Sequence, residues 1–407
     1  VWDSPAWFED QDEDELSRSM VCMTSRRMEW SPVENLGPGA PPLFEGGEKQ
    51  EPEATAEIIA NKDVMATTGS ARQNWLNAAE KELQSITDLN VFEEKSEESL
   101  QEVLREARRK GITPEFLPSS MVWTIKPPKP PEYVKKHKAR LCVAGNMSKL
   151  FGEAYTPTLD SCFAKMILKL AVVRSWTVAI TDIRTAFLHA PLPEDRCVIV
   201  RPPAGLIRLG LVKKTDVWWL RKALYGLREC PRLWAQERDT KLKTMSWIVD
   251  GKKFCMVNNI VDPTMWSIKD ENTDTLEGVV ATYVDDVMFA GPAKVVKGGL
   301  KALNALWKCD EPVILPPNEK STAVYLGIEI IRSDDGTIIL TQNKYTSQLL
   351  QRLKVESTRA IGTTGENSWM VDPPDVSRLE PASLKDCQEA LGGLLWLCTR
   401  TRMDIAF

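Results

Sequence analysis

Three aspartates interrupt two apolar runs of this 407-residue chain, where carboxylates are otherwise uncommon. Asp285 and Asp286 are adjacent within residues 279–290, a run built largely of residues that favour β-strands. Asp182 follows a second apolar run, residues 176–181. Burying an unpaired carboxylate is costly, so a carboxylate pair at a strand turn suggests a site for a divalent cation, which prefers oxygen ligands.

Each of these acids also has a plainer explanation. Asp285 and Asp286 could form an exposed hairpin turn, but residues 334–336 (Asp-Asp-Gly) show how such a turn looks in this chain, with a glycine and polar neighbours. Asp182 could cap a following helix, a role that does not conflict with metal binding. If both strands end at one point, the three carboxylates could hold two Mg²⁺ ions for phosphoryl or nucleotidyl transfer.

A basic stretch precedes these acids in the sequence. Residues 126–140 contain six Lys and Arg and a single acid. Lys138 and Arg140 alternate, so on a strand they share one face, where they could neutralise a triphosphate or the backbone of a template. Lys135 and Lys136 are better explained as part of a solvated loop.

The overall composition is that of an ordinary globular protein in a reducing compartment. Hydrophobic residues make up 43% and charged residues 27%, no apolar run approaches the length of a membrane span, and the nine cysteines lack C-x-x-C spacing. Residues 1–63 hold 15 Asp and Glu against 5 Lys and Arg, a net of −10, so the rest of this −5 chain carries +5. A basic body permits a nucleic-acid partner. Because the chain opens on Val1, we expect it to be part of a longer translation product.

Apolar periodicity predicts the elements that must position these residues. Helices are expected over residues 70–83, 100–110, 163–174, 231–244 and 379–397. Strands are expected over 121–125, 140–144 and 177–181, on both sides of a turn within 278–290, and as a hairpin over 325–331 and 337–341. Residues 126–132 are Pro-rich and should break regular structure. Residues 1–70 are acidic and rich in Pro and Gly, which predicts a disordered linker, with a partner-binding acidic arm as the alternative.

A series of blocks from Trp75 to Phe407 resembles the reverse transcriptase domain of copia-type LTR retrotransposons. The blocks are residues 75–83, 123–126, 138–144, 155–158, 182–188, 224–227 (Leu-Tyr-Gly-Leu) with Pro231, Arg232 and Trp234, 283–286 (Tyr-Val-Asp-Asp), 325–330, 342–345, 391–396 and 402–407. A Tyr-x-Asp-Asp tetrapeptide alone would be weak evidence, whereas many blocks in the family's order are specific.

The resemblance implies an α+β protein with the right-hand polymerase fold, whose palm is an antiparallel sheet backed by helices. The implied divisions are a disordered acidic arm at 1–70, fingers at 71–175, a palm at 176–320 with a returning fingers segment near 191–235, and a partial thumb with the start of a connection at 321–407. The implied enzyme is an RNA-directed DNA polymerase with two Mg²⁺ ions, or Mn²⁺ as an alternative. Its implied partners are an RNA or DNA template, a DNA primer and dNTPs, and no membrane.

The resemblance also assigns roles to individual residues. The catalytic metal ligands would be Asp182, Asp285 and Asp286. The nucleotide would be bound by Lys138, Arg140 and Phe187, and the template and primer by Tyr225, Gly226, Arg232 and Tyr283. Phe187 would lie beneath the sugar and exclude a 2′-hydroxyl, although its apolar neighbours also allow an ordinary core position.

The chain departs from the family pattern at two places. Arg228-Glu229 stands where the family usually has Lys-Gln, and Met403 stands where Pro is usual. The family's ribonuclease H domain would begin after Phe407, and the chain has no integrase or protease signature. We therefore expect a fragment of a polyprotein, with the integrase and ribonuclease H domains as partners, or a truncated copy.

Two other functions stay open at this point. One is a degenerate or co-opted copy that binds nucleic acid without catalysis, which the intact acids oppose and Glu229 favours. The other is a different two-metal enzyme such as a nuclease, which the order of the blocks opposes. For the polymerase, the expected location is intracellular, in a cytoplasmic virus-like particle, with the nucleus as a second site.

Overall fold

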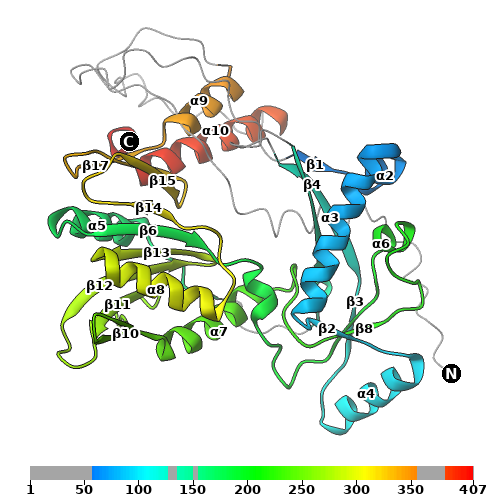
Figure 1. The fold of residues 1–407 in the computed structure, drawn as a ribbon. Coiled ribbons are helices and arrows are strands. Elements are labelled where there is room, and N and C mark those ends of the chain that lie inside the picture. The colour runs from blue at the N-terminus through cyan, green and yellow to red at the C-terminus, as the bar shows by residue number, and fades with distance from the viewer. Residues whose placement is uncertain (1–56, 127–134, 150–154, 355–380, 407) are drawn as a thin grey trace, which may run out of the picture.

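The computed structural model describes residues 57–126, 135–149, 155–354 and 381–406. Most of the expected N-terminal linker and of the Pro-rich break at 126–132 lies outside these residues. In Figure 1 a large sheet with α5, α7 and α8 forms one half of the molecule, and α3 with β4 belongs to the other half. The helix α10 and the strands β15 and β17 lie together at one end of the first half.

The first half is built on a seven-stranded sheet in the order β14-β6-β13-β12-β11-β10-β9, with every neighbouring pair antiparallel. Its strands are β6 (Thr177–Asp182), β9 (Ser246–Val249), β10 (Lys252–Asn258), β11 (Met265–Asp270), β12 (Leu276–Tyr283), β13 (Asp286–Gly291) and β14 (Val313–Leu315). Both faces are covered, which is why β6 and β13 are almost continuously apolar. The helices α7 (Cys230–Thr244) and α8 (Ala293–Leu306) pack on one face, and α5 (Ser161–Val173) packs on the other.

The second half joins two smaller sheets. One contains β1 (Glu57–Ile59), β4 (Ser119–Lys126) and β5 (Lys136–Val143), covered by α3 (Gly69–Asp88). The other has the order β2-β8-β7-β3, formed by Phe92–Glu94, Trp218–Leu220, Val198–Val200 and Glu115–Leu117, with α4 (Glu97–Arg109) against it. A short helix, α6 (Ala204–Arg208), packs on β4.

The boundary of the expected linker at residue 70 is wrong. Residues 57–59 pair with β4, and residues 61–66 form α2 (Asn61–Ala66). The buried indole of Trp123 donates its Nε1–H to Asn61 Oδ1 at 3.0 Å. The acidic composition of residues 1–70 hid this short, anchored segment at its end.

The expected hairpin near residues 325–341 also needs correction. Residues 325–331 are not one strand, because β15 (Ser321–Tyr325) ends at Tyr325 and β16 (Ile328–Arg332) begins three residues later. Leu326 and Gly327 both have positive φ, 53° and 71°, the conformation of a tight two-residue turn. The second strand is confirmed as β17 (Ile338–Thr341). These strands form a separate three-stranded sheet.

The remaining predicted elements correspond to observed ones with shifted ends. The helices α3, α4, α5 and α7 are confirmed, and the last helix is α10 (Pro381–Arg400), which packs on α9 (Asn343–Arg352). The α+β class is confirmed, since helices cover sheets in which only β3 and β7 pair in parallel among the named strands. Within the described parts of the chain, every helix is too short or too polar to cross a membrane.

Candidate active site

The three aspartates singled out in the sequence meet at one end of the large sheet. Asp182 is the last residue of β6, Asp286 is the first of β13, and the two are register partners across this antiparallel pair. Tyr283, at the end of β12, is the register partner of Asp286, so Val284 and Asp285 form the two-residue turn between these strands. The backbone N–H of Ile183 donates to the Asp285 carbonyl at 2.9 Å. The backbone therefore gathers these acids as expected, while their catalytic role stays a prediction.

The donor set at this point suits a hard divalent cation, because carboxylate oxygens are its preferred ligands. In the described residues, however, no group of three or more His, Cys, Asp or Glu side chains already has an arrangement that could hold a metal ion. The fit to an ion at this end of the sheet therefore rests on the type of the three side chains and on the backbone register that brings them to one place.

The end of β6 is fixed by a segment that sequence analysis missed. The backbone N–H of Asp310 donates to the Asp182 carbonyl at 2.9 Å, and Thr181 Oγ1 donates to the Asp310 carbonyl at 2.8 Å. The side chain of Arg184 pairs with the Asp310 carboxylate. Burial, together with the charges of Asp182 and Asp310, raises the pKa of the Cys309 thiol to about 11, so this thiol is neutral near pH 7. No short-range sequence signal links Asp310 to Asp182.

Three of the residues assigned to nucleotide and template, Phe187, Tyr225 and Arg140, come together in the structure. Phe187 lies in a 3₁₀ turn, Ala186–His189, and is half-buried although Ala186 and Leu188 are buried. Its ring packs edge-on against Tyr225, with centroids 6.0 Å apart. The guanidinium of Arg140 lies 6.0 Å from the centroid of the same Tyr225 ring. Phe187 is therefore a partly exposed residue at this junction rather than a fully buried core residue.

Gly226 has a packing role that the sequence could not reveal. The loop that contains Tyr225 and Gly226 lies directly on the end of β5, where the Val143 N–H donates to the Tyr225 carbonyl at 2.7 Å. Gly226 has φ 95°, and a Cβ there would lie 2.1 Å from the Val143 carbonyl oxygen. Any larger residue would force this loop away from β5.

The basic candidates lie on two elements, β5 and α7. Lys138 and Arg140 lie on the same face of β5, both half-buried. Their charges lower the pKa of Glu82 on α3, but its burial dominates and raises that pKa to about 6. Arg232 lies on α7, where its Nη1 donates to Gln236 Oε1 at 3.4 Å.

The unusual acid Glu229 has a partner within the protein. Arg196 donates from Nη2 to Glu229 Oε1 at 2.6 Å and from Nη1 to Glu115 Oε2 at 2.7 Å, and all three side chains are largely buried. Glu115 also accepts hydrogen bonds from Ser148 Oγ and from the backbone N–H of Lys149. The charge of Glu229 is thus compensated locally, so this departure from the family pattern does not by itself indicate decay.

Comparison with known proteins identifies the family. The family model described as reverse transcriptase (RNA-dependent DNA polymerase) matches residues 114–365. The chain is 27% identical over 309 residues to the retrovirus-related Pol polyprotein from transposon RE2 of Arabidopsis thaliana, covering 70% of this chain and 19% of that protein. It is 27% identical over 279 residues to the corresponding polyprotein from transposon TNT 1-94 of Nicotiana tabacum, covering 67% and 19%. The chain therefore spans about a fifth of the length of these relatives.

A solved structure, foamy viral protease-reverse transcriptase dRH in complex with ds DNA, aligns with 86% of this chain and 54% of its own, at 12% identity and a TM-score of 0.33. That superposition is too loose to equate the two folds. The sequence matches confirm the expected relation to retrotransposon polyproteins. Because its family model matches more than half of the sequence, the chain belongs to the reverse transcriptase (RNA-dependent DNA polymerase) family.

Proposed function

We propose that this chain is the polymerase part of a retrotransposon polyprotein and that it copies an RNA or DNA template into DNA. The observation that carries the proposal is the pairing of Asp182 with Asp286 across β6 and β13, with Asp285 in the adjoining turn. Family membership supplies the class of reaction, and this pairing gathers the acids that the reaction needs.

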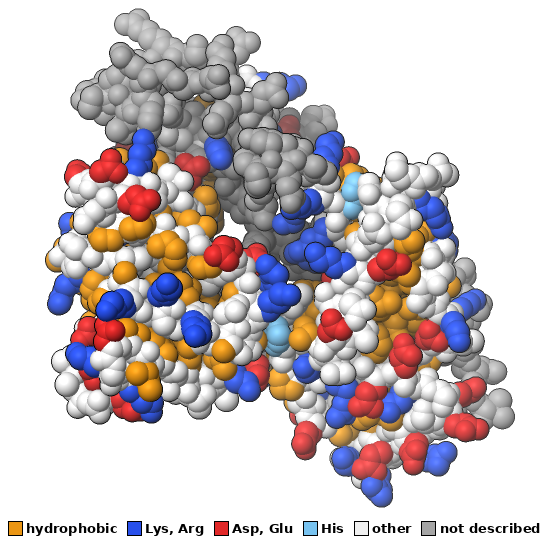
Figure 2. Space-filling model, in the orientation of Figure 1, with side chains coloured by type: hydrophobic (Ala, Val, Ile, Leu, Met, Phe, Trp, Pro, Cys, Tyr) orange, Lys and Arg blue, Asp and Glu red, His pale blue; other side chains and the backbone are white. Residues whose placement is uncertain are grey.

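In this proposal the described residues form a right-hand polymerase. The palm is the seven-stranded sheet of residues 176–320 with α5 on one face, the fingers are the rest of residues 71–175 with residues 57–66 and the segment near 191–235, and residues 321–407 belong to the thumb and connection. Figure 2 shows a hollow between the two halves, with acidic side chains on one wall and Lys and Arg side chains opposite. A nucleic acid would suit such a hollow, because Lys and Arg side chains can neutralise its negatively charged phosphates.

The proposed reaction is attack of a primer 3′-hydroxyl on the α-phosphate of a dNTP, with pyrophosphate leaving. Two bound Mg²⁺ ions, or Mn²⁺, would supply activation of the hydroxyl and stabilisation of the leaving group. Asp182, Asp285 and Asp286 would hold them, and Lys138 and Arg140 would neutralise phosphate charge. Phe187 would pack beneath the sugar.

The template and primer would run past Tyr225, Gly226, Arg232 and Tyr283. The whole polyprotein would add ribonuclease H and integrase domains, and we propose that it acts in a cytoplasmic particle and in the nucleus. Expression of the tagged chain in cells, with fractionation of particles and nuclei, tests that location.

Primer extension tests the function. The protein should extend a DNA primer on RNA and DNA templates only when Mg²⁺ or Mn²⁺ is supplied. Asp182→Asn, Asp285→Asn and Asp286→Asn should each abolish extension, because a neutral amide holds a hard cation poorly, and double variants should lose no more than single ones.

The matched control is Asp334→Asn, since this exposed aspartate lies in a turn far along the sequence from the site. It should extend primers like the unmodified protein. Normal extension by Asp285→Asn would refute the assignment of the site. An unmodified protein that binds template and primer but extends nothing would favour the non-catalytic copy.

A further inference from the structure

The turn between β12 and β13 contains a strained residue. Val284 has φ 55°, in the left-handed region that β-branched residues rarely adopt. The two-residue turns Asp250-Gly251 and Leu326-Gly327 each pair a residue of positive φ with a glycine, whereas the longer turn between β11 and β12 has Asp274 at φ 56° without one. The turn at Val284 has no glycine, so some other interaction must keep it in this conformation.

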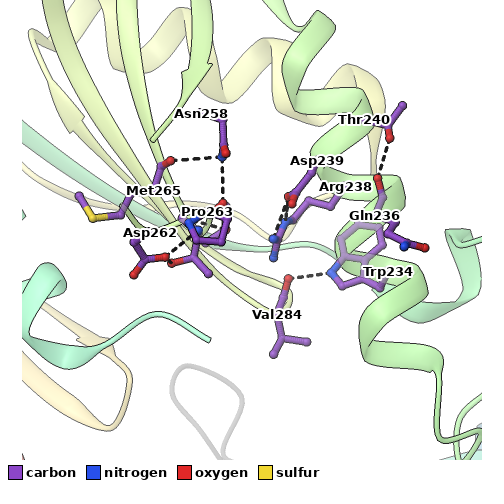
Figure 3. A network of polar contacts seen from close by, with 12 residues as sticks. Trp234, Gln236, Arg238, Asp239, Thr240, Asn258, Asp262, Pro263, Met265 and Val284 are labelled. Carbon is purple, nitrogen blue, oxygen red and sulfur yellow. Dashed lines mark hydrogen bonds and ion pairs between the residues drawn. The ribbon is translucent and has the colours of Figure 1, made fainter. Parts of the chain in front are cut away.

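A buried tryptophan supplies such an interaction. Trp234 on α7 donates its indole Nε1–H to the Val284 carbonyl at 2.7 Å, and Figure 3 shows the indole pointing at that carbonyl. Trp234 is 1% exposed and its ring packs edge-on against Trp307 at 5.2 Å. The position of the donor is therefore fixed by core packing, independently of the turn.

The rest of the turn is held by other elements. The Ile183 N–H donates to the Asp285 carbonyl, as described above, and at the base of the turn the N–H and hydroxyl of Thr282 both donate to the Thr264 carbonyl, at 2.9 and 3.0 Å. Val284 is thus the strained point of a turn whose flanks are secured, and the carbonyl at that point is bound by Trp234.

We propose that Trp234 is a positioning residue that holds Val284 in its left-handed conformation and thereby sets where Asp285 and Asp286 lie relative to Asp182. The role in metal placement rests on the function proposed above, whereas the hold on the turn does not. Buried indole N–H groups usually find an acceptor, so what distinguishes Trp234 is that its acceptor is the carbonyl of the strained residue Val284.

Trp234→Phe separates these two roles, because it keeps a large buried ring and removes the donor. Trp266→Phe is the matched control. Trp266 is 0% exposed on the neighbouring strand β11, and its buried Nε1 has no hydrogen-bond partner in the structure. Both substitutions replace a buried indole by a phenyl ring, but only Trp234→Phe removes a hydrogen-bond donor from the Val284 carbonyl.

The first measurement is hydrogen–deuterium exchange of the peptide covering residues 283–287 in the full chain. Trp234→Phe should speed exchange of this peptide about tenfold, while Trp266→Phe should leave it close to that of the unmodified protein. Equal exchange in the two variants would overturn the proposal. This measurement needs no metal or substrate, so it is independent of whether the chain is a polymerase.

The second measurement is Mn²⁺ affinity, read from the electron paramagnetic resonance of free Mn²⁺. Trp234→Phe should weaken binding about tenfold, and the factor should shrink in a Val284→Gly background, where glycine adopts positive φ without strain. If Trp234→Phe weakens Mn²⁺ binding by the same factor with and without Val284→Gly, the role of strain is contradicted. Absence of Mn²⁺ binding and of primer extension in the unmodified protein would instead count against the proposed function.

Discussion

Glu82 should make the stability of the protein fall as pH rises through mildly acidic values. This carboxylate lies on α3, is 9% exposed, and accepts a hydrogen bond from the Leu141 N–H of β5 at 3.1 Å. Burial raises its pKa from an ordinary 4.5 to about 6, against the opposing effects of that hydrogen bond and of the nearby cations Lys138 and Arg140. A rise of this size corresponds to ~2 kcal/mol between the two protonation states.

The direction of this pH dependence follows from whether the folded or the unfolded protein binds the proton on Glu82 more tightly. Between pH 4.5 and 6 the folded protein keeps a proton on Glu82 that the unfolded chain has released. The contribution of Glu82 to the free energy of unfolding is therefore fully present below pH 4.5 and is lost as pH rises through 6. A carboxylate whose pKa is lowered by folding acts in the opposite direction.

The assay is urea unfolding followed by tryptophan fluorescence at several values of pH from about 4.5 to 7.5, which spans both pKa values of Glu82. Glu82→Gln keeps an acceptor for the Leu141 N–H and cannot ionise. The free energy of unfolding of the unmodified protein, measured relative to that of Glu82→Gln, should fall by ~2 kcal/mol between about pH 4.5 and 7. Glu80→Gln, an exposed change on the same helix, should show no such trend. A flat difference for Glu82→Gln would refute the reasoning.

Three further outcomes are expected. If the ring of Phe187 lies beneath the sugar, Phe187→Val should raise the ratio of kcat/KM for CTP over dCTP. If Phe187 is instead a core residue, the substitution should lower kcat/KM for both nucleotides and cost about 2–4 kcal/mol of stability. Arg196→Met should destabilise the protein by about 3–5 kcal/mol in urea unfolding, because it leaves buried carboxylates without their cation, and adding Glu229→Gln should recover part of that loss. Deleting residues 1–56 should leave the thermal unfolding midpoint unchanged. Deleting residues 1–66 should lower it, because the longer deletion removes β1 and α2. Equal midpoints would contradict the anchoring role of residues 57–66.

The elements around the acids could be predicted because their sequence patterns are local. A strand buried on both faces is an apolar run in the sequence, so β6 and β13 stand out, and a carboxylate at the end of such a run stands out further. Turns inside apolar sequence were harder. Leu326-Gly327 reverses the chain between two β-forming stretches, and no polar cluster marked it.

Long-range partners could not be predicted in the same way. The backbone of Asp310 binds that of Asp182 across more than a hundred intervening residues, and Arg196 joins Glu115 to Glu229, three residues from separate segments. Each of these residues looks like an ordinary surface charge in the sequence. Only the fold shows that Arg196 and its partners are mostly buried, and therefore that Glu229 is accommodated.

The Leu-Tyr-Gly-Leu segment, the most specific block of the resemblance, connects the two halves of the molecule at the candidate site. Within it, Tyr225 and Gly226 lie against the end of β5, the strand that carries the basic candidates. The helix α7 begins shortly afterwards at Cys230, and its Trp234 reaches the Val284 carbonyl. One short stretch of chain thus links the strand expected to bind phosphates to the turn expected to bind metal.

The ends of this stretch are held independently of each other. Glu229, just before α7, is fixed by Arg196, so the start of that helix is held as well as the loop on β5. A change in the length or path of this segment would alter the separation of the basic strand and the acidic turn, because each end makes close contacts that leave little room for adjustment. The segment can therefore be a specific mark of the family even where its side chains touch no substrate, because it sets the distance between the basic strand and the acidic turn.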